Sequence, residues 1–98
     1  MNPVLPTQES VGRGRASYVA TCAVCHGDAG RGDGPGGAAL PKKPADLVVH
    51  VPLHSDQVLF NFIQNGILPS GMPAQKGNLS EQQTWDLVNY LRTLASGR

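Results

Sequence analysis

The sequence has few aromatic side chains and no long apolar run. Its 98 residues include one Trp, two Tyr and two Phe, against 12 Gly and 8 Pro. A chain of this length forms one domain and buries only about 60–65% of the surface that it exposes when unfolded. No segment reaches the roughly 18 apolar residues of a transmembrane helix. We therefore predict a single domain that does not itself insert into a membrane and that needs a further apolar component in its interior.

Charge of either sign is also scarce. Eight Lys and Arg residues face seven Asp and Glu residues, for a net charge of +1, and the basic residues are scattered along the chain. Nucleic-acid-binding domains concentrate positive charge on one face. We therefore expect no nucleic-acid partner and no attraction to an anionic membrane surface.

The spacing of apolar residues predicts a first helix that begins at a Ser10 cap and runs to about Cys25. Two glycines within it, Gly12 and Gly14, each cost about 1 kcal/mol relative to Ala in a helix interior. At least one of them should therefore serve close packing. The apolar residues expected to share one face of this helix are Val11, Tyr18, Val19 and Cys22.

Capping residues predict two further helices. Ser55 precedes an apolar set with helical spacing, and Gly66 stands where a C-terminal cap belongs. Ser80 and Gln83 form a capping box before an amphipathic stripe that ends near Ser96. No segment shows the sustained alternation of a strand, so the domain is expected to be all-α.

Long loops separate these helices. Residues 27–44 contain six Gly and three Pro, and residues 67–77 are again interrupted by Pro and Gly. Loops of this length in so small a domain suggest wrapping around an inserted ligand. Residues 1–9 are expected to form an N-terminal arm or linker, and residues 10–98 the folded domain.

The only two cysteines lie in the pentapeptide Cys22-Ala23-Val24-Cys25-His26. Cys-x-x-Cys-His is the attachment signature of c-type haem. One turn of chain holds both thiols near the two vinyl groups of one porphyrin edge, and the following His26 can offer a ring nitrogen to the iron. The porphyrin would also supply the apolar volume that the side chains lack.

Other interpretations of the two cysteines are weaker. A thioredoxin-like redox pair needs a βαβ pattern, which is not evident. A zinc site would need two further ligands such as His50 and His54, but Pro52 lies between them and the expected helix of a zinc finger is absent. A disulfide across so short a span is strained and closes almost no loop. A chance occurrence would leave the small core unexplained.

The sixth iron position has one favoured candidate. Met72 is the only methionine besides Met1 and lies between Gly71 and Pro73 in the second loop. Most methionines fill gaps in cores, but this setting is poor for packing and suitable for reaching inward. His50 and His54 are the rival ligands, and either would give a lower reduction potential.

With these residues in place, the chain resembles the class I c-type cytochromes from about Ser10 to Ala95. In that family a Gly eight residues before the first haem cysteine and an aromatic residue four before it pack against the last helix. Gly14 and Tyr18 occupy these places, and Leu87 and Tyr90 match their usual partners.

The resemblance also implies a fold and further site residues. It implies the cytochrome c fold, with three to four helices and long loops wrapped around one covalently bound haem. Pro35 matches a proline whose carbonyl accepts a hydrogen bond from the proximal His, although the segment around it is richer in glycine than the family pattern. Met72 matches the family's distal ligand. The haem-binding residues would be Cys22, Cys25, His26, Pro35 and Met72, with His26 and Met72 as the iron ligands.

We therefore predict a single-electron carrier rather than an enzyme. The alternative, a haem enzyme or gas sensor with an open sixth site, would normally need a polar acid–base group, whereas the second loop and its end offer Ser70, Gln75 and Lys76. An apolar shell should keep water from the iron. Its expected members are Val24, Leu40, Leu47, Leu59, Phe62, Ile63, Leu68, Leu87 and Leu91.

The partners and the location follow from this function. Redox proteins should serve as donor and acceptor, among them membrane-bound complexes such as a terminal oxidase in a respiratory chain. Because haem c is normally attached outside the cytoplasm, we expect a periplasmic or otherwise extracytoplasmic domain and a natural chain with a signal or membrane anchor. Cytochromes of this size occur both free, as monomers, and fused within larger membrane-bound redox proteins; a monomer is expected here.

Overall fold

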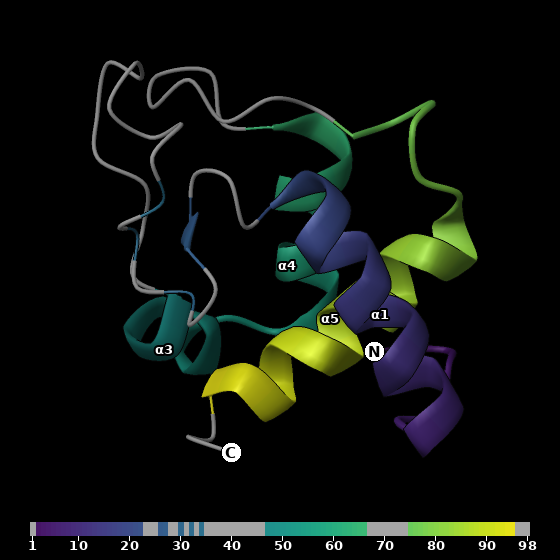
Figure 1. Ribbon diagram of the computed structural model, residues 1–98, viewed down its shortest axis with the longest axis horizontal. Coiled ribbons are helices and arrows are strands. Elements are labelled where there is room, and N and C mark those ends of the chain that lie inside the picture. The colour runs from purple at the N-terminus through teal and green to yellow at the C-terminus, as the bar shows by residue number, and fades with distance from the viewer. Residues whose placement is uncertain are drawn as a thin grey trace.

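The structure is a computed structural model that describes residues 2–22, 26, 27, 30, 32, 34, 47–66 and 75–95. The prediction of an all-α domain is confirmed, since the described residues contain helices and only one isolated bridge, between Lys76 and Leu79. None of the helices in these ranges is long and apolar enough to cross a membrane. The helices are α1 (Gln8–Thr21), α3 (Leu47–His50), the 3-10 helix η2 (Val51–Leu53), α4 (Asp56–Asn65) and α5 (Glu81–Ala95) (Figure 1).

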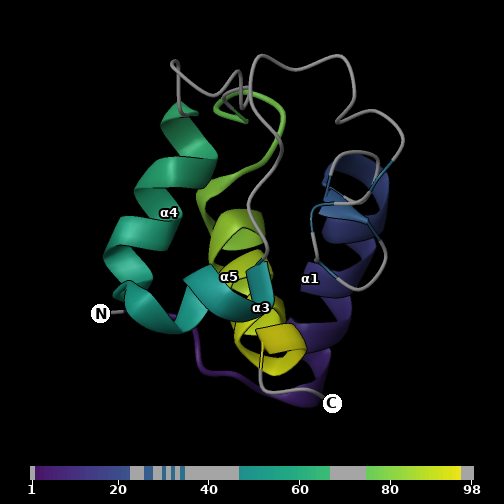
Figure 2. The same cartoon turned by 90° about the vertical axis from the view of Figure 1, so that its left-hand side faces the viewer.

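The N-terminal and C-terminal helices cross in close contact. Figure 2 shows α5 between α1 and α4, so α5 forms the centre of the helical part. Gly14 lies at the crossing, where an added Cβ would come within 2.1 Å of the Asp86 carbonyl oxygen and 2.8 Å of the Tyr90 Cβ. Tyr18, one turn further along α1, packs its ring 5.4 Å from that of Tyr90. The expectation that a glycine of this helix serves close packing is therefore confirmed for Gly14.

The expected cap of the first helix was wrong. Thr7, not Ser10, is the N-cap, and its Oγ1 accepts a hydrogen bond from the Ser10 N–H at 3.1 Å. Ser10 is buried inside α1 and donates its hydroxyl to Asp86 Oδ1 at 2.6 Å. Arg13 donates to the other oxygen of this buried carboxylate at 2.8 Å, and this hydrogen bond raises the pKa of Arg13. The Ser10 hydroxyl, which could have capped α1, instead connects α1 to α5.

Two amide side chains, Asn2 of the N-terminal arm and Asn89 of α5, bind the arm to α5. Asn89 Nδ2 donates to the carbonyls of Val4 and Leu5 at 3.1 and 3.4 Å, and to the Ser10 hydroxyl at 2.9 Å. Asn2 donates in return to Asn89 Oδ1 at 2.8 Å. Asn89 is buried, so these hydrogen bonds replace the water that its amide would otherwise bind.

The local signals of the other two predicted helices are confirmed. Ser55 caps α4 through a hydrogen bond from the Val58 N–H at 3.2 Å, and Gly66 is the C-cap of α4. Ser80 and Gln83 form the predicted reciprocal pair before α5, at 2.8 and 3.0 Å. The buried hydrophobic core of the described residues consists of Tyr18, Val51, Leu59, Ile63, Leu79, Trp85, Leu87, Val88 and Leu91.

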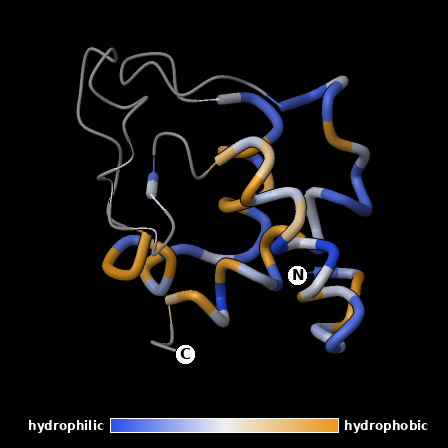
Figure 3. Tube along the Cα trace, viewed as in Figure 1, coloured by the Kyte–Doolittle hydropathy of each residue, from blue (hydrophilic) through white to orange (hydrophobic). Residues whose placement is uncertain are grey.

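Two features of the described surface were not predicted. The Val-rich run 47–53 is helical as α3 and η2, and it carries the exposed side chains Val49 and Leu53, at 57% and 69%. Figure 3 shows α3 as a largely hydrophobic segment at the edge of the molecule. Val19 was placed on the apolar face of the first helix, but its side chain is 59% exposed. It lies next to Tyr18 in the sequence and therefore points away from the face on which Tyr18 packs.

Arg92 connects this segment to α5. Its guanidinium donates to the carbonyls of Val51 and His54 at 2.7 and 2.6 Å and to the Asp56 carboxylate at 2.9 Å. The three acceptors come from η2, from the residue after it and from the first turn of α4. A single planar, five-donor group thus fixes the turn between η2 and α4.

Arg92→Lys should lower the free energy of unfolding of the holoprotein by about 1–3 kcal/mol, because an ammonium group cannot reach all three acceptors in this planar arrangement. Denaturant unfolding followed by circular dichroism measures the loss. Arg15→Lys on the exposed surface of α1 is the matched control and should change little. Equal stability of the two variants would contradict the role assigned to Arg92.

Candidate functional site

The C-terminal end of α1 places the first cysteine. Cys22 is the C-cap of this helix, and its N–H donates to the Tyr18 carbonyl at 2.8 Å. Its Sγ lies 3.4 Å from Thr21 Oγ1, and the side chain is half-buried. The thiol is therefore held at a helix end with part of its surface open.

His26 lies one turn beyond this cysteine. Its N–H donates to the Cys22 carbonyl at 2.9 Å, which is the i to i−4 hydrogen bond of a helix. Its carbonyl accepts from the Gly32 N–H at 2.8 Å, and its side chain is half-buried. The structure therefore brings Cys22 and His26 together as the sequence predicts.

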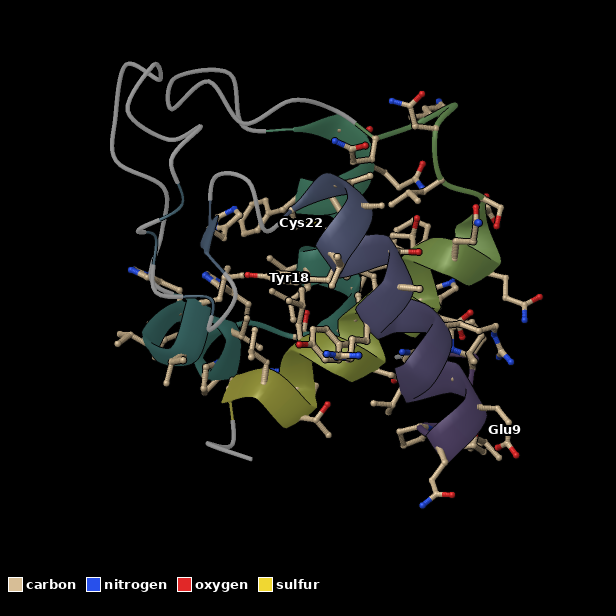
Figure 4. The ribbon with its side chains drawn as sticks, viewed as in Figure 1. Glu9, Tyr18 and Cys22 are labelled. Carbon is tan, nitrogen blue, oxygen red and sulfur yellow. The ribbon has the colours of Figure 1, made fainter. Side chains whose placement is uncertain are left out.

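The hydroxyl of Tyr18 fixes the residue that follows the histidine. Tyr18 Oη donates to the Gly27 carbonyl at 2.5 Å, and the Tyr18 side chain is only 1% exposed. Figure 4 shows Tyr18 and Cys22 near the C-terminal end of α1. Sequence reasoning gave Tyr18 a packing role only. The available signal was its residue type, because a buried Tyr usually finds a hydrogen-bond partner that a Phe would not need.

Gly30, four residues after the histidine, lies close to two other helices. Its φ is +77°, and an added Cβ would lie 2.7 Å from Leu94 Cδ2. Its carbonyl accepts from the Leu47 N–H at 2.6 Å, at the start of α3. Left-handed backbone and close approach both favour glycine here. Gly30 therefore lies against both α5 and α3, which the sequence did not reveal.

Three of the predicted site residues, Cys25, Pro35 and Met72, lie outside the described residues. Of the predicted apolar shell, Leu59, Ile63, Leu87 and Leu91 are buried, Leu47 and Phe62 are half-buried, and Val24, Leu40 and Leu68 lie outside the described residues.

The two rival histidines differ in their surroundings. His50 is exposed at the end of α3. His54 is half-buried, with its ring edge-on to Phe62 at 5.3 Å between ring centres. Its carbonyl accepts from Arg92 at 2.6 Å.

The donor chemistry at the end of α1 fits a covalently attached haem. A thiol and an imidazole one helical turn apart are the first and last members of the Cys-x-x-Cys-His attachment sequence. Hydrogen bonds from Tyr18 and Gly32 hold the backbone on the C-terminal side of this turn. Cys22 and His26 would hold the group from one side, as a thioether and an axial imidazole.

Comparisons with known proteins agree with this fit. Residues 9–91 match the family described as cytochrome C oxidase, cbb3-type, subunit III. The fold is similar to that of a chain of the reducing HAO-like protein complex of Kuenenia stuttgartiensis, with a TM-score of 0.82, 28% identity and 94% of this chain covered. The present chain spans 46% of that chain. A search of curated protein sequences gave no significant match.

The match extends over most of the chain, from the first turns of α1 to the last turns of α5, and so includes the attachment sequence and both crossing helices. The predicted cytochrome c fold is confirmed by the structural similarity. The chain therefore belongs to the cbb3-type cytochrome c oxidase subunit III family, as a c-type cytochrome domain that binds haem c.

Proposed function

We propose that this domain carries single electrons on one haem c, bound through Cys22 and Cys25 and ligated by His26 and Met72. When bound, haem supplies an iron that gains and loses one electron between its ferric and ferrous states. The observation that carries the proposal is that the His26 N–H donates to the Cys22 carbonyl, one helical turn away. The Tyr18 hydroxyl and the Gly32 N–H bind the carbonyls of Gly27 and His26. Hydrogen bonds that hold a ligand residue favour fast electron transfer, because little of the protein has to move when the charge changes.

When haem is bound, His26 and Met72 would be its two iron ligands, and two protein ligands would leave the coordination number unchanged between the oxidation states. The Pro35 carbonyl would accept a hydrogen bond from the other ring nitrogen of His26, which would fix the ring and tune its basicity. The Met72 thioether would favour ferrous iron and raise the potential relative to a second imidazole. The buried side chains Leu59, Ile63 and others of the predicted shell exclude water.

The partners are redox proteins that donate and accept one electron. The family name, cytochrome C oxidase, points to a terminal oxidase among them. The structural relative is a chain of a complex described as reducing and HAO-like, which agrees with redox partners. Small transient interfaces suit such encounters. We place the domain outside the cytoplasm, in a periplasmic respiratory chain, either as a free monomer or within a larger membrane-bound protein. The division into an arm (1–9) and a cytochrome c domain (10–98) stays a prediction.

Absorption spectroscopy of the matured protein tests this function. We expect a pyridine haemochrome with the spectrum of haem c at one haem per chain, a weak far-red band from methionine-to-iron charge transfer in the ferric state, and a redox titration with one electron. A colourless, folded preparation from cells that mature c-type cytochromes would contradict haem attachment. Rapid carbon monoxide binding to the native ferrous protein would instead indicate the alternative, an open sixth site.

A further inference from the structure

Both ends of the second loop meet at the C-terminal end of α4. Gly66 starts the loop directly after this helix. On the other side, the Gln75 N–H donates to the Ile63 carbonyl at 2.9 Å and the Lys76 N–H to the Gln64 carbonyl at 3.1 Å. The chain that leaves α4 therefore returns to its last turn before it continues to α5, as Figure 2 shows for the segment from residue 75 onward.

Residues 75–79, which follow the second loop and lead to α5, are called the return segment below. The side chain of Gln64 connects this return segment to α5. Its Nε2 donates to Thr84 Oγ1 at 2.6 Å and, more weakly, to the Leu79 carbonyl at 3.4 Å. Thr84 Oγ1 in turn donates a hydrogen bond to the Ser80 carbonyl at 2.8 Å. Gln64 is 8% exposed and Thr84 is fully buried. One residue thus binds the return segment through its backbone carbonyl and the first turn of α5 through its amide.

An apolar residue would suit the position of Gln64 if packing were its only role. The other buried residues of α4, Leu59 and Ile63, are apolar. A buried amide is costly unless it is hydrogen-bonded, and its value then lies in fixing its partners in one geometry. These partners, Lys76, Leu79 and Thr84, all follow residues 67–74, the segment that contains Met72.

We propose that Gln64 is a positioning residue for the axial methionine: it holds the return segment of the second loop against α4 and α5 and so keeps Met72 on the iron. This inference rests on the proposed ligation by His26 and Met72. Gln64 itself does not bind the iron. Its removal should raise the fraction of molecules in which the methionine is detached.

Cyanide binding to the ferric holoprotein measures that fraction, because cyanide needs an open sixth position. The apparent affinity of such a ligand scales with the population of the binding-competent state. We expect Gln64→Leu and Thr84→Val each to strengthen cyanide binding about tenfold, because each removes the buried hydrogen bond that joins these two side chains. Hydrogen exchange at the Gln75 and Lys76 amides should accelerate in both variants, which reports the loosened frame independently of the iron.

Two further variants separate positioning from general stability. Thr84→Ser keeps the hydroxyl and should restore parental cyanide affinity. Ser10→Ala removes a buried hydrogen bond at the α1–α5 crossing and should lower stability without changing cyanide binding. If Gln64→Leu does not fold, the cyanide affinity of the milder Thr84→Val variant tests the positioning role of Gln64.

The outcomes distinguish the two proposals. A parent protein with the far-red methionine band whose Thr84→Val variant binds cyanide as the parent does would overturn the role of Gln64 and leave the ligation intact. A parent without that band, with cyanide bound freely, would overturn the ligation by Met72 and this inference together.

Discussion

Gly14→Ala should lower the free energy of unfolding of the holoprotein by about 3 kcal/mol or more. The added methyl group would lie 2.1 Å from the Asp86 carbonyl oxygen and 2.6 Å from its carbon, and both are backbone atoms of α5. No side-chain rotation relieves such a contact, so α1 and α5 have to separate. A midpoint temperature lower by on the order of 15 °C would follow for a domain of this size.

Separation of these helices should also affect the site. Tyr18 packs on Tyr90 and donates to the Gly27 carbonyl, so a displaced α1 carries the turn from Cys22 to His26 with it. We therefore expect a lower yield of haem-loaded protein from cells that mature c-type cytochromes, measured as the ratio of haem absorbance to protein.

Gly12 provides the matched control two residues away. An added Cβ at Gly12 meets nothing within 4 Å, and its backbone is helical. Gly12→Ala should therefore stabilise the protein by up to about 1 kcal/mol through helix propensity alone. Similar stabilities for the Gly14 and Gly12 variants would show that the helix crossing is looser than the structure indicates.

The opposite roles of these glycines illustrate what the sequence can and cannot show. Helix propensity identifies both as unfavourable, but only the family resemblance singled out Gly14. Local signals were sufficient for α4 and α5, because Ser55, Ser80 and Gln83 act within one turn of their partners. Signals of this kind depend on neighbouring residues, so they can be read without the fold.

The start of α1 shows why other elements were misjudged. Thr7 and Ser10 can both cap a helix, and nothing nearby decides between them. The decision comes from Asp86, 76 residues further along, which takes the Ser10 hydroxyl. Similarly, residues 47–53 carry no cap signal that favours a helix over an extended run, and Arg92 of α5 binds the carbonyls of this segment. Long-range partners of this kind are not visible in a local pattern.

The candidate site likewise contains residues that a local sequence pattern identified and residues that it did not. The attachment sequence identified Cys22 and His26 because covalent chemistry requires a fixed spacing. The groups that hold this turn in place were not identified, because their partners are backbone carbonyls: Tyr18 binds that of Gly27, and Gly30 offers its own to Leu47. Because every residue has a backbone carbonyl, the sequence does not show which carbonyl accepts such a hydrogen bond.

Met72→Ala should change the properties of the iron more than any other single substitution outside the attachment sequence. With the proposed ligation, loss of the thioether would remove a ligand that stabilises ferrous iron, so the reduction potential should fall by on the order of 0.1–0.3 V, within the roughly 0.8 V range that axial ligands produce. The far-red band of the ferric protein should disappear. Carbon monoxide should bind the ferrous protein rapidly, and cyanide the ferric protein, because no side chain then occupies the sixth position.

The rival ligands provide the controls for this experiment. His54→Ala and His50→Ala should both keep the far-red band and a potential close to that of the parent, since the His54 ring packs edge-on to Phe62 and His50 is exposed. A Met72→Ala protein that keeps the band would show that another residue is the ligand. If the parent instead lacks the band and has the low potential of a bis-imidazole iron, cyanide binding that strengthens in the His54 variant alone would identify His54 as the ligand.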